Sequence, residues 1–108
     1  MSRLPMTTDL ALQLNLPPIH PGGILRDELE ALGLSANVMA RALDVPPNRI
    51  TEILNGTRAL SADTALRLAR YFGTSAQFWM NLQSSYDLAI AERDRGVSIS
   101  ERVRPRAA

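Results

Sequence analysis

Four polar side chains lie close together near the middle of this 108-residue sequence, spaced as on the outward side of a short helix. They are Asn48, Arg49, Thr51 and Glu52, and Thr57 and Arg58 follow shortly after them. Amide, guanidinium, hydroxyl and carboxylate groups at such positions can hydrogen-bond to base edges in the major groove of DNA. The alternative is an ordinary solvated helix face, and the polar segment alone does not separate the two interpretations.

The frame around this segment, residues 35–58, predicts two short helices joined by a tight turn. Ser35 is suited to cap the first helix, because its hydroxyl can accept an orphan backbone N–H. Asp44 is expected to end that helix in a left-handed conformation. Pro47 suits the start of the second helix, where a missing N–H costs nothing, and Gly56 marks its end. This helix–turn–helix frame favours DNA binding over a merely solvated face.

Three further helices are expected, at residues 22–32, 61–72 and about 75–95. The first and the second are predicted to stop at Gly33 and Gly73, because glycine adopts the left-handed conformation that ends many helices. Together with the central pair they predict an all-α bundle of five helices with a longer C-terminal helix, and no convincing long strand.

The predicted organisation has an N-terminal extension (1–18), one domain (19–95, with the helix–turn–helix core at 35–55) and a flexible C-terminal tail (96–108). Leucines alternate with other residues in the extension, at Leu10, Leu12, Leu14 and Leu16. This period of two predicts either a loosely ordered tail or an extended segment that pairs with a partner. The C-terminal tail carries Arg102, Arg104 and Arg106, which are expected to contact DNA phosphates or a partner.

An apolar stripe runs along the last predicted helix and consists of Trp79, Leu82, Tyr86 and Ile90. Trp79 and Tyr86 either finish the core or, with the rest of the stripe, form a dimer interface. A dimer interface is expected because two recognition helices need a two-fold axis to read two half-sites.

Composition excludes several classes of function. The sequence has no cysteine, which removes disulfide and thiolate chemistry, and its single histidine, His20, cannot build a metal cluster. No catalytic constellation or phosphate-binding glycine loop is present, so we expect neither an enzyme nor a cofactor. With no long apolar run and no signal peptide, a cytoplasmic protein is expected. The net charge of +1 means that DNA binding depends on local placement of charge.

Three sequence words carry a family resemblance: IHPG at 19–22, SADTALRLARYF at 61–72 and TSAQFWMNLQ at 74–83. With the central block, they resemble the HigA-type (VapI-like) antitoxins of the lambda-repressor-like (XRE) helix-turn-helix family. The resemblance covers about residues 19–93. It implies a DNA-binding antitoxin of a type II toxin–antitoxin system that represses its own operon and neutralises a HigB-like toxin, an mRNA-cleaving endoribonuclease. The alternative is a stand-alone regulator without a toxin partner.

The resemblance also implies which residues contact double-stranded operator DNA, an inverted repeat bound by a homodimer. They are Ser35, Asn37, Asn48, Arg49, Thr51, Glu52, Asn55, Thr57 and Arg58. This sequence departs from the family pattern in that Ala36 replaces a frequent glutamine, Pro47 takes a position that is often polar, and Thr57 stands where a basic residue is common. Base contacts are therefore expected to be few, with more weight on Arg49, Arg58 and DNA shape.

A toxin-binding surface is expected where neither DNA nor the dimer interface is. This leaves residues 1–18 and the outward side of the first helix, which carries Asp27, Glu28 and Glu30. An acidic face suits a basic, RNA-cleaving partner, because complementary charge speeds encounter. The alternative is that this face is merely solvated and the extension disordered.

Overall fold

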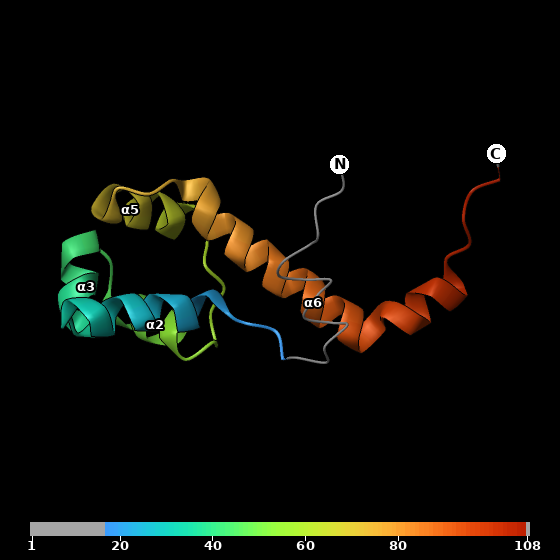
Figure 1. Ribbon diagram of the computed structural model, residues 1–108, viewed down its shortest axis with the longest axis horizontal. Helices are drawn as coiled ribbons and strands as arrows, with labels where there is room; N and C mark the ends of the chain where they lie inside the picture. The colour runs from blue at the N-terminus through green and yellow to red at the C-terminus, as the bar shows by residue number, and fades with distance from the viewer. Residues whose placement is uncertain (1–16, 108) are drawn as a thin grey trace. The chain divides into compact units, whose positions relative to one another are not determined.

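The structure is a computed structural model that describes residues 17–107. These residues hold five helices and no strand, which confirms the all-α prediction: α2 (Pro21–Leu32), α3 (Ala36–Leu43), α4 (Pro47–Leu54), α5 (Ala62–Phe72) and α6 (Ala76–Arg102). The chain divides into two compact units, one of residues 19–84 and a second that includes residues 85–108. The first unit contains the predicted helix–turn–helix, and its helices α2, α3 and α5 are labelled in Figure 1.

Helix α2 begins where the sequence places proline and histidine together. The Nδ1 atom of His20 accepts a hydrogen bond from the backbone N–H of Gly22 at 2.9 Å, so this imidazole caps the helix. Pro21 occupies the first turn, where its missing N–H leaves no bond unmade. At the other end Gly33 has φ = 67°, as predicted for a glycine stop.

The predicted helix–turn–helix is confirmed in its local details. The hydroxyl of Ser35 caps α3 by accepting from the N–H of Val38 at 3.2 Å. Asp44 ends α3 with φ = 58°, and among the described residues it is the one non-glycine residue with a positive φ. Pro47 opens α4, and Gly56 follows that helix with φ = 77°. Turn chemistry therefore fixes the ends of both helices.

Helix α5 also matches its prediction, with Ser61 accepting from the N–H of Thr64 and Gly73 left-handed at φ = 71°. The predicted end of the last helix near Arg95 is wrong, because α6 continues to Arg102. Gly96 is not among the glycines with positive φ, so it lies inside the helix instead of ending it. An interior glycine weakens a helix by about 1 kcal/mol relative to alanine but does not break it.

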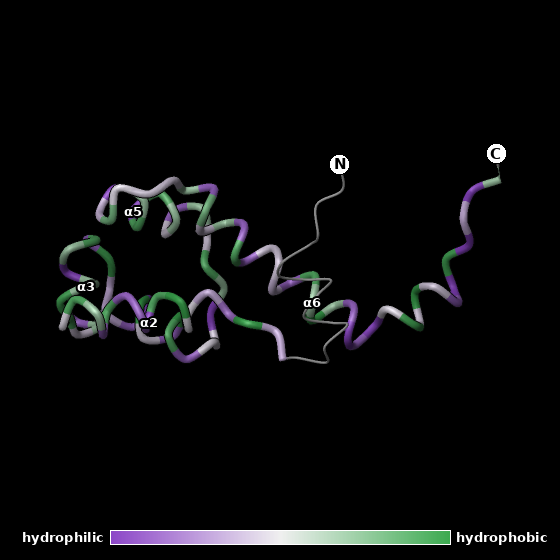
Figure 2. The backbone as a smooth tube through the Cα atoms, viewed as in Figure 1, coloured by the Kyte–Doolittle hydropathy of each residue, from purple (hydrophilic) through white to green (hydrophobic). Residues whose placement is uncertain are grey.

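The core of the first unit joins α2–α5 and the start of α6. Its largest fully buried apolar side chains are Leu25, Met39, Ile50, Ile53, Leu60, Leu68 and Trp79. Figure 2 shows that apolar and polar residues alternate along the helices of this unit, as amphipathic helices require. Where α2 packs against α4, a Cβ on Gly22 would overlap the carbonyl oxygen of Ile53. Only glycine permits this close approach between the start of α2 and the last turn of α4.

Two polar contacts secure the connections before and after α5. The Oε1 atom of Gln83 accepts from the N–H of Leu60 at 2.7 Å, and Gln83 is only 5% exposed. The indole Nε1–H of Trp79 donates to Thr74 Oγ1 at 3.0 Å. These bonds satisfy polar groups that would otherwise be buried without partners. Within residues 17–107, no helix is long and apolar enough to cross a membrane.

Candidate nucleic-acid interface

Helix α4 presents one apolar and one polar face. Ile50 and Ile53 are fully buried, and they anchor the helix to the core. The opposite face carries Asn48, Thr51 and Asn55, all exposed, at a spacing that repeats with the helix turn. The structure therefore brings these three predicted DNA-contacting residues together on one accessible surface.

The start of α3 lies beside the start of α4. Ser35 and Asn37, both predicted to contact phosphates, are exposed there. Asn37 lines a shallow groove of about 570 Å³ together with the helix–turn–helix turn and the first residues of α4. The lining residues are Asn37, Ala40, Arg41, Asp44, Val45, Pro46 and Pro47.

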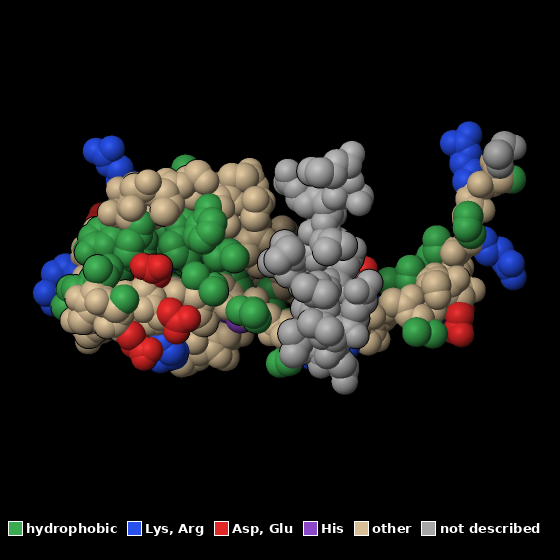
Figure 3. Space-filling model, in the orientation of Figure 1, with side chains coloured by type: hydrophobic (Ala, Val, Ile, Leu, Met, Phe, Trp, Pro, Cys, Tyr) green, Lys and Arg blue, Asp and Glu red, His purple; other side chains and the backbone are tan. Residues whose placement is uncertain are grey.

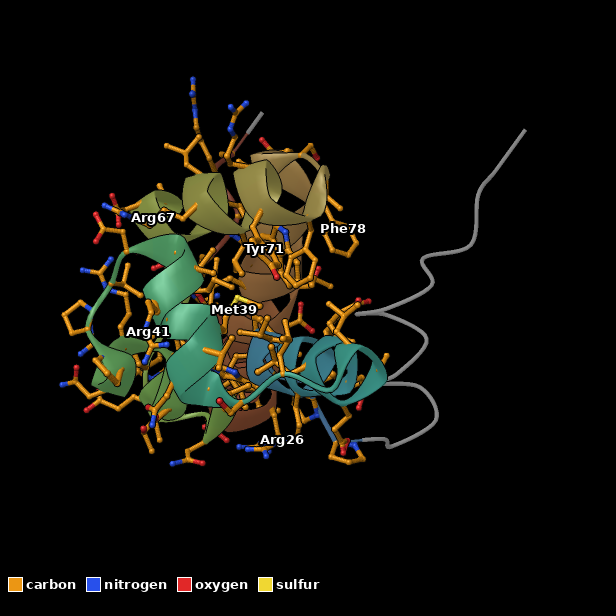
Figure 4. All side chains as sticks on the ribbon, turned by 90° about the vertical axis from the view of Figure 1, so that its left-hand side faces the viewer. Arg26, Met39, Arg41, Arg67, Tyr71 and Phe78 are labelled. Carbon is orange, nitrogen blue, oxygen red and sulfur yellow. The ribbon has the colours of Figure 1, made fainter. Side chains whose placement is uncertain are left out.

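The sequence interpretation missed Arg41, which shares this groove with Asn37. The two residues are four apart on α3 and so lie on the same side of that helix, a spacing that the sequence already contained. Figure 4 shows Arg41 and Arg67 along one edge of the first unit and Phe78 at the opposite edge. Arg41 adds a cation next to the predicted phosphate-binding residues.

Arg49 is held by a carboxylate from the next helix. Its Nη1 atom lies 2.7 Å from Oδ2 of Asp63, in the first turn of α5, and its side chain is 29% exposed. The same Oδ2 atom accepts from Nε of Arg67 at 2.9 Å. Arg67 Nη1 in turn donates to the carbonyls of Leu43 and Asp44, at 2.8 and 3.2 Å. A chain of hydrogen bonds thus joins the turn, α5 and the predicted recognition helix.

The two arginines also determine the protonation of Asp63. The hydrogen bond from Arg67 is the largest influence and lowers the pKa of this carboxyl, while partial desolvation raises it and the hydrogen bond from Arg49 lowers it again. The net effect is a pKa below the usual value. Asp63 therefore remains ionised, and remains a hydrogen-bond acceptor, throughout the neutral range.

Glu52 and Arg58 form a second pair at the end of α4. Oε1 of Glu52 lies 2.7 Å from Nε and 2.6 Å from Nη2 of Arg58. The carbonyl of Glu52 accepts from the N–H groups of Thr57 and Arg58 and from the Thr57 hydroxyl. Glu52, predicted to meet a base, therefore also organises the loop that is predicted to meet phosphates.

Thr51 uses its hydroxyl proton within α4, donating to the carbonyl of Pro47 at 3.0 Å. Its oxygen can still accept a hydrogen bond, and threonine also offers a methyl group for contact with thymine. Among the described residues, no group of three or more His, Cys, Asp or Glu side chains could hold a metal ion. The chemistry of this surface is that of hydrogen bonding and charge.

Comparison with known proteins identifies the family to which this chain belongs. The helix-turn-helix family matches residues 25–79. A HigA-family addiction module antidote protein from Coxiella burnetii has a solved structure similar to this one, with a TM-score of 0.82 and 51% sequence identity. The match covers 84% of this chain and 100% of that chain. This chain belongs to the HigA-type helix-turn-helix family.

Two other members of the family show how far the likeness extends. Virulence-associated protein I of Dichelobacter nodosus is 57% identical over 81 residues, which cover 74% of this chain and 75% of that protein. The structure of the Pseudomonas aeruginosa antitoxin HigA with the higBA promoter has a TM-score of 0.80 and 50% identity. It covers 83% of this chain and 99% of that chain. In these relatives the likeness extends well beyond the helix–turn–helix core.

The predicted dimer residues differ in their burial. Trp79 is 2% exposed in the core of the first unit, where it contacts the rings of Phe72 and Phe78. Of the alternatives for Trp79, the structure shows the core role, so this side chain offers almost no surface to a second HigA-type protomer. The other three predicted residues, Leu82, Tyr86 and Ile90, are half-buried.

The acidic side chains predicted to face a toxin are exposed on α2. Asp27, Glu28 and Glu30 all lie on the solvent side of this helix. Figure 3 shows red side chains gathered over α2 on the face that it displays. The alternating leucines at residues 10–16, the other half of that prediction, lie outside the described residues.

Proposed function

We propose that this chain is the sequence-specific DNA-binding antitoxin of a cytoplasmic type II toxin–antitoxin pair. It represses its own operon and neutralises a HigB-like endoribonuclease. The observation that carries the proposal is the polar face of α4, where Asn48, Thr51 and Asn55 are exposed above the buried Ile50 and Ile53. The P. aeruginosa HigA structure with promoter DNA supports it.

In this proposal α4 enters the major groove and its surroundings hold the DNA backbone. Asn48, Arg49, Thr51 and Glu52 face the bases, whereas Asn55, Thr57, Arg58, Ser35 and Asn37 contact phosphates. Phosphate contacts set the register of a protein on DNA, and base contacts select the sequence. With one short helix in the groove, each protomer reads only a few base pairs.

A homodimer supplies the second recognition helix. We place its interface at Leu82, Tyr86 and Ile90 on α6, where each side chain is half-buried in the single chain. The operator is then an inverted repeat with half-sites about 34–36 Å apart, one turn of DNA. Charged residues in place of Tyr86 and Ile90 are expected to lower DNA affinity without altering a DNA-facing residue, and light scattering on the variant reports the loss of the dimer.

The toxin-binding surface is proposed to be the acidic side of α2 with residues 1–18. Its support is that Asp27, Glu28 and Glu30 are exposed and belong to α2, not to the polar face of α4. Toxins that cleave RNA must bind a polyanion, so a cluster of carboxylates can compete for the same basic surface. Neutralisation of the toxin is inferred from the family, and this surface is our assignment of it.

The DNA half of the proposal is tested by fluorescence anisotropy on about 30 base pairs of the chain's own promoter and on a scrambled duplex. Specific binders prefer their sites over random DNA by roughly a thousandfold or more at physiological salt. Equal affinity for the two duplexes would contradict sequence-specific binding. A protein that stays monomeric on the promoter duplex would contradict the homodimer.

The toxin half is tested by co-expression pull-down with the product of the adjacent gene. The triple variant Asp27→Asn, Glu28→Gln, Glu30→Gln without residues 1–18 should release the toxin but still bind the promoter. Asp94→Asn, which removes an exposed carboxylate elsewhere, is the matched control. Retention of the toxin by the triple variant would overturn the assignment of this surface to toxin binding. Absence of any toxin from wild-type pull-downs would favour the stand-alone regulator.

A further inference from the structure

The guanidinium of Arg49 is fixed before any DNA arrives. Its Nη1 atom is engaged with Asp63, whereas this contact leaves the hydrogens on Nε and on the second amino nitrogen unused. Recognition of guanine by arginine needs two parallel donors that point at O6 and N7. One edge of the Arg49 fork is therefore held by protein, and another edge remains for a base.

Asp63 is itself held in place. Arg67 donates to the same carboxylate oxygen at 2.9 Å and also to two carbonyls of the helix–turn–helix turn. Because Arg67 and Asp63 are four residues apart on α5, helix geometry sets their pairing. The orientation of Asp63 is thus tied to the same backbone turn that sets the angle of α4. Loss of ordering entropy on binding is smaller when a long side chain is already positioned.

The charge of Asp63 matters as well as its geometry. Its side chain is 57% exposed, so an approaching phosphate encounters a carboxylate next to Arg49. An arginine without this neighbour would pair with phosphates on any sequence, because that contact carries no sequence information. The carboxylate repels phosphate oxygens but leaves the free edge of the arginine available to a guanine.

We propose that Asp63 is a positioning and specificity-determining residue for DNA reading, which orients Arg49 toward a guanine and disfavours its use on phosphates. The inference deepens the proposed function and rests on it. Asp63 touches neither base nor phosphate in this proposal, and it acts through Arg49.

The test compares Asp63→Asn with wild type on the promoter duplex, on every single base-pair substitution of it and on random DNA. We expect promoter affinity to fall and random-DNA affinity to rise, so that the preference narrows by roughly tenfold or more, the size of one lost bidentate base contact. The loss of sequence preference should be concentrated at the base pair where Arg49→Ala also abolishes discrimination between bases. In the Arg49→Ala background, Asp63→Asn should cause no further loss of preference.

Two controls separate positioning from folding and from bulk charge. Asp94→Asn removes a carboxylate of similar exposure, 53%, that is also paired with an arginine, and it should leave the preference unchanged. Asp63→Glu restores the charge and is expected to recover part of the preference. Thermal unfolding of each variant shows whether the fold persists. If Asp63→Asn does not fold, the DNA preference of Asp63→Glu is compared with that of wild type instead.

Each result decides the matter. If Asp63→Asn strengthens binding to promoter and random DNA equally, Asp63 only masks a cation and the proposal is wrong. If Asp63→Asn weakens binding to all DNA sequences equally, and does so in the Arg49→Ala background as well, Asp63 has a structural role and the proposal is wrong. If Arg49→Ala leaves base preference unchanged, the base-reading role in the proposed function fails and this inference fails with it. An effect of Arg49→Ala with none from Asp63→Asn overturns the positioning role alone.

Discussion

The carboxylate of Glu52 and the guanidinium of Arg58 meet through one oxygen, with Oε1 2.7 Å from Nε and 2.6 Å from Nη2. Both side chains are more than 40% exposed, so the pair contributes little to stability. Its consequence is geometric, because it holds Arg58 beside the end of α4 instead of letting it extend into solvent.

Replacing Arg58 by alanine is expected to weaken binding to all DNA sequences similarly. Each phosphate contact that is lost reduces the slope of log K against log salt by about 0.9. Anisotropy titrations at several salt concentrations measure that slope. Arg93→Ala, which removes an exposed and ion-paired arginine of α6, should keep the slope. A loss confined to the promoter sequence would show that Arg58 reads a base.

Local structure was predictable from this sequence because its signals are short in range. Ser35, Asp44 and Gly73 act on the backbone within a few residues of themselves, and each ends or caps a helix as predicted. The end of the last helix was predicted wrongly, because that helix was expected to stop near Arg95, whereas Gly96 remains helical and α6 continues to Arg102. Whether a glycine ends a helix depends on the packing around it as well as on its own type.

The contacts that organise the candidate site were not predictable in the same way. Asp63 reaches Arg49 across 14 residues of sequence, and Gln83 reaches Leu60 across 23. Nothing in the local pattern specifies such pairs, because they exist only after α5 and α6 have packed on the core. The residue types on α4 could be read from sequence, but their partners required the tertiary structure.

Gly22→Ala should destabilise the protein by about 1–3 kcal/mol, the usual cost of overpacking. The added Cβ would overlap the carbonyl oxygen of Ile53, so α2 and α4 must separate. Denaturant unfolding measures the loss. The neighbouring Gly23→Ala is the matched control, because nothing lies within 4 Å of its Cβ position. That variant should be neutral or more stable by up to about 1 kcal/mol, and equal losses for both would contradict the packing argument.

Gln83→Ala is expected to cost about 1–3 kcal/mol, since it leaves the buried N–H of Leu60 without its acceptor. Chemical denaturation monitored by Trp79 fluorescence gives the value. Gln77→Ala removes an exposed amide that only bonds Asn81 on the same helix, and should change stability by less than about 0.5 kcal/mol. Similar values for the two variants would mean that Gln83 does not secure the loop.

Acid should remove the contribution of Asp63. Its pKa is lowered in the folded protein by Arg67 first and by Arg49 as well, so the ionised form is favoured by folding. The stabilisation is then present above the pKa of the unfolded chain and is lost as pH falls through the lower folded value. Thermal midpoints of wild type and Asp63→Asn should differ by a constant amount at neutral pH and converge in strong acid. A difference that grows on acidification would contradict this sign.

The central claim, that α4 reads DNA through Arg49, is tested most directly by measuring the affinity of wild type and Arg49→Ala for the chain's own promoter and for a scrambled duplex at one salt concentration. Arg93→Ala, which removes an exposed and ion-paired arginine of α6, serves as the control. The account predicts a loss of about 1–3 kcal/mol on the promoter for Arg49→Ala, little change on scrambled DNA, and no selective loss for Arg93→Ala. An equal loss on both duplexes, or no loss on either, would contradict it.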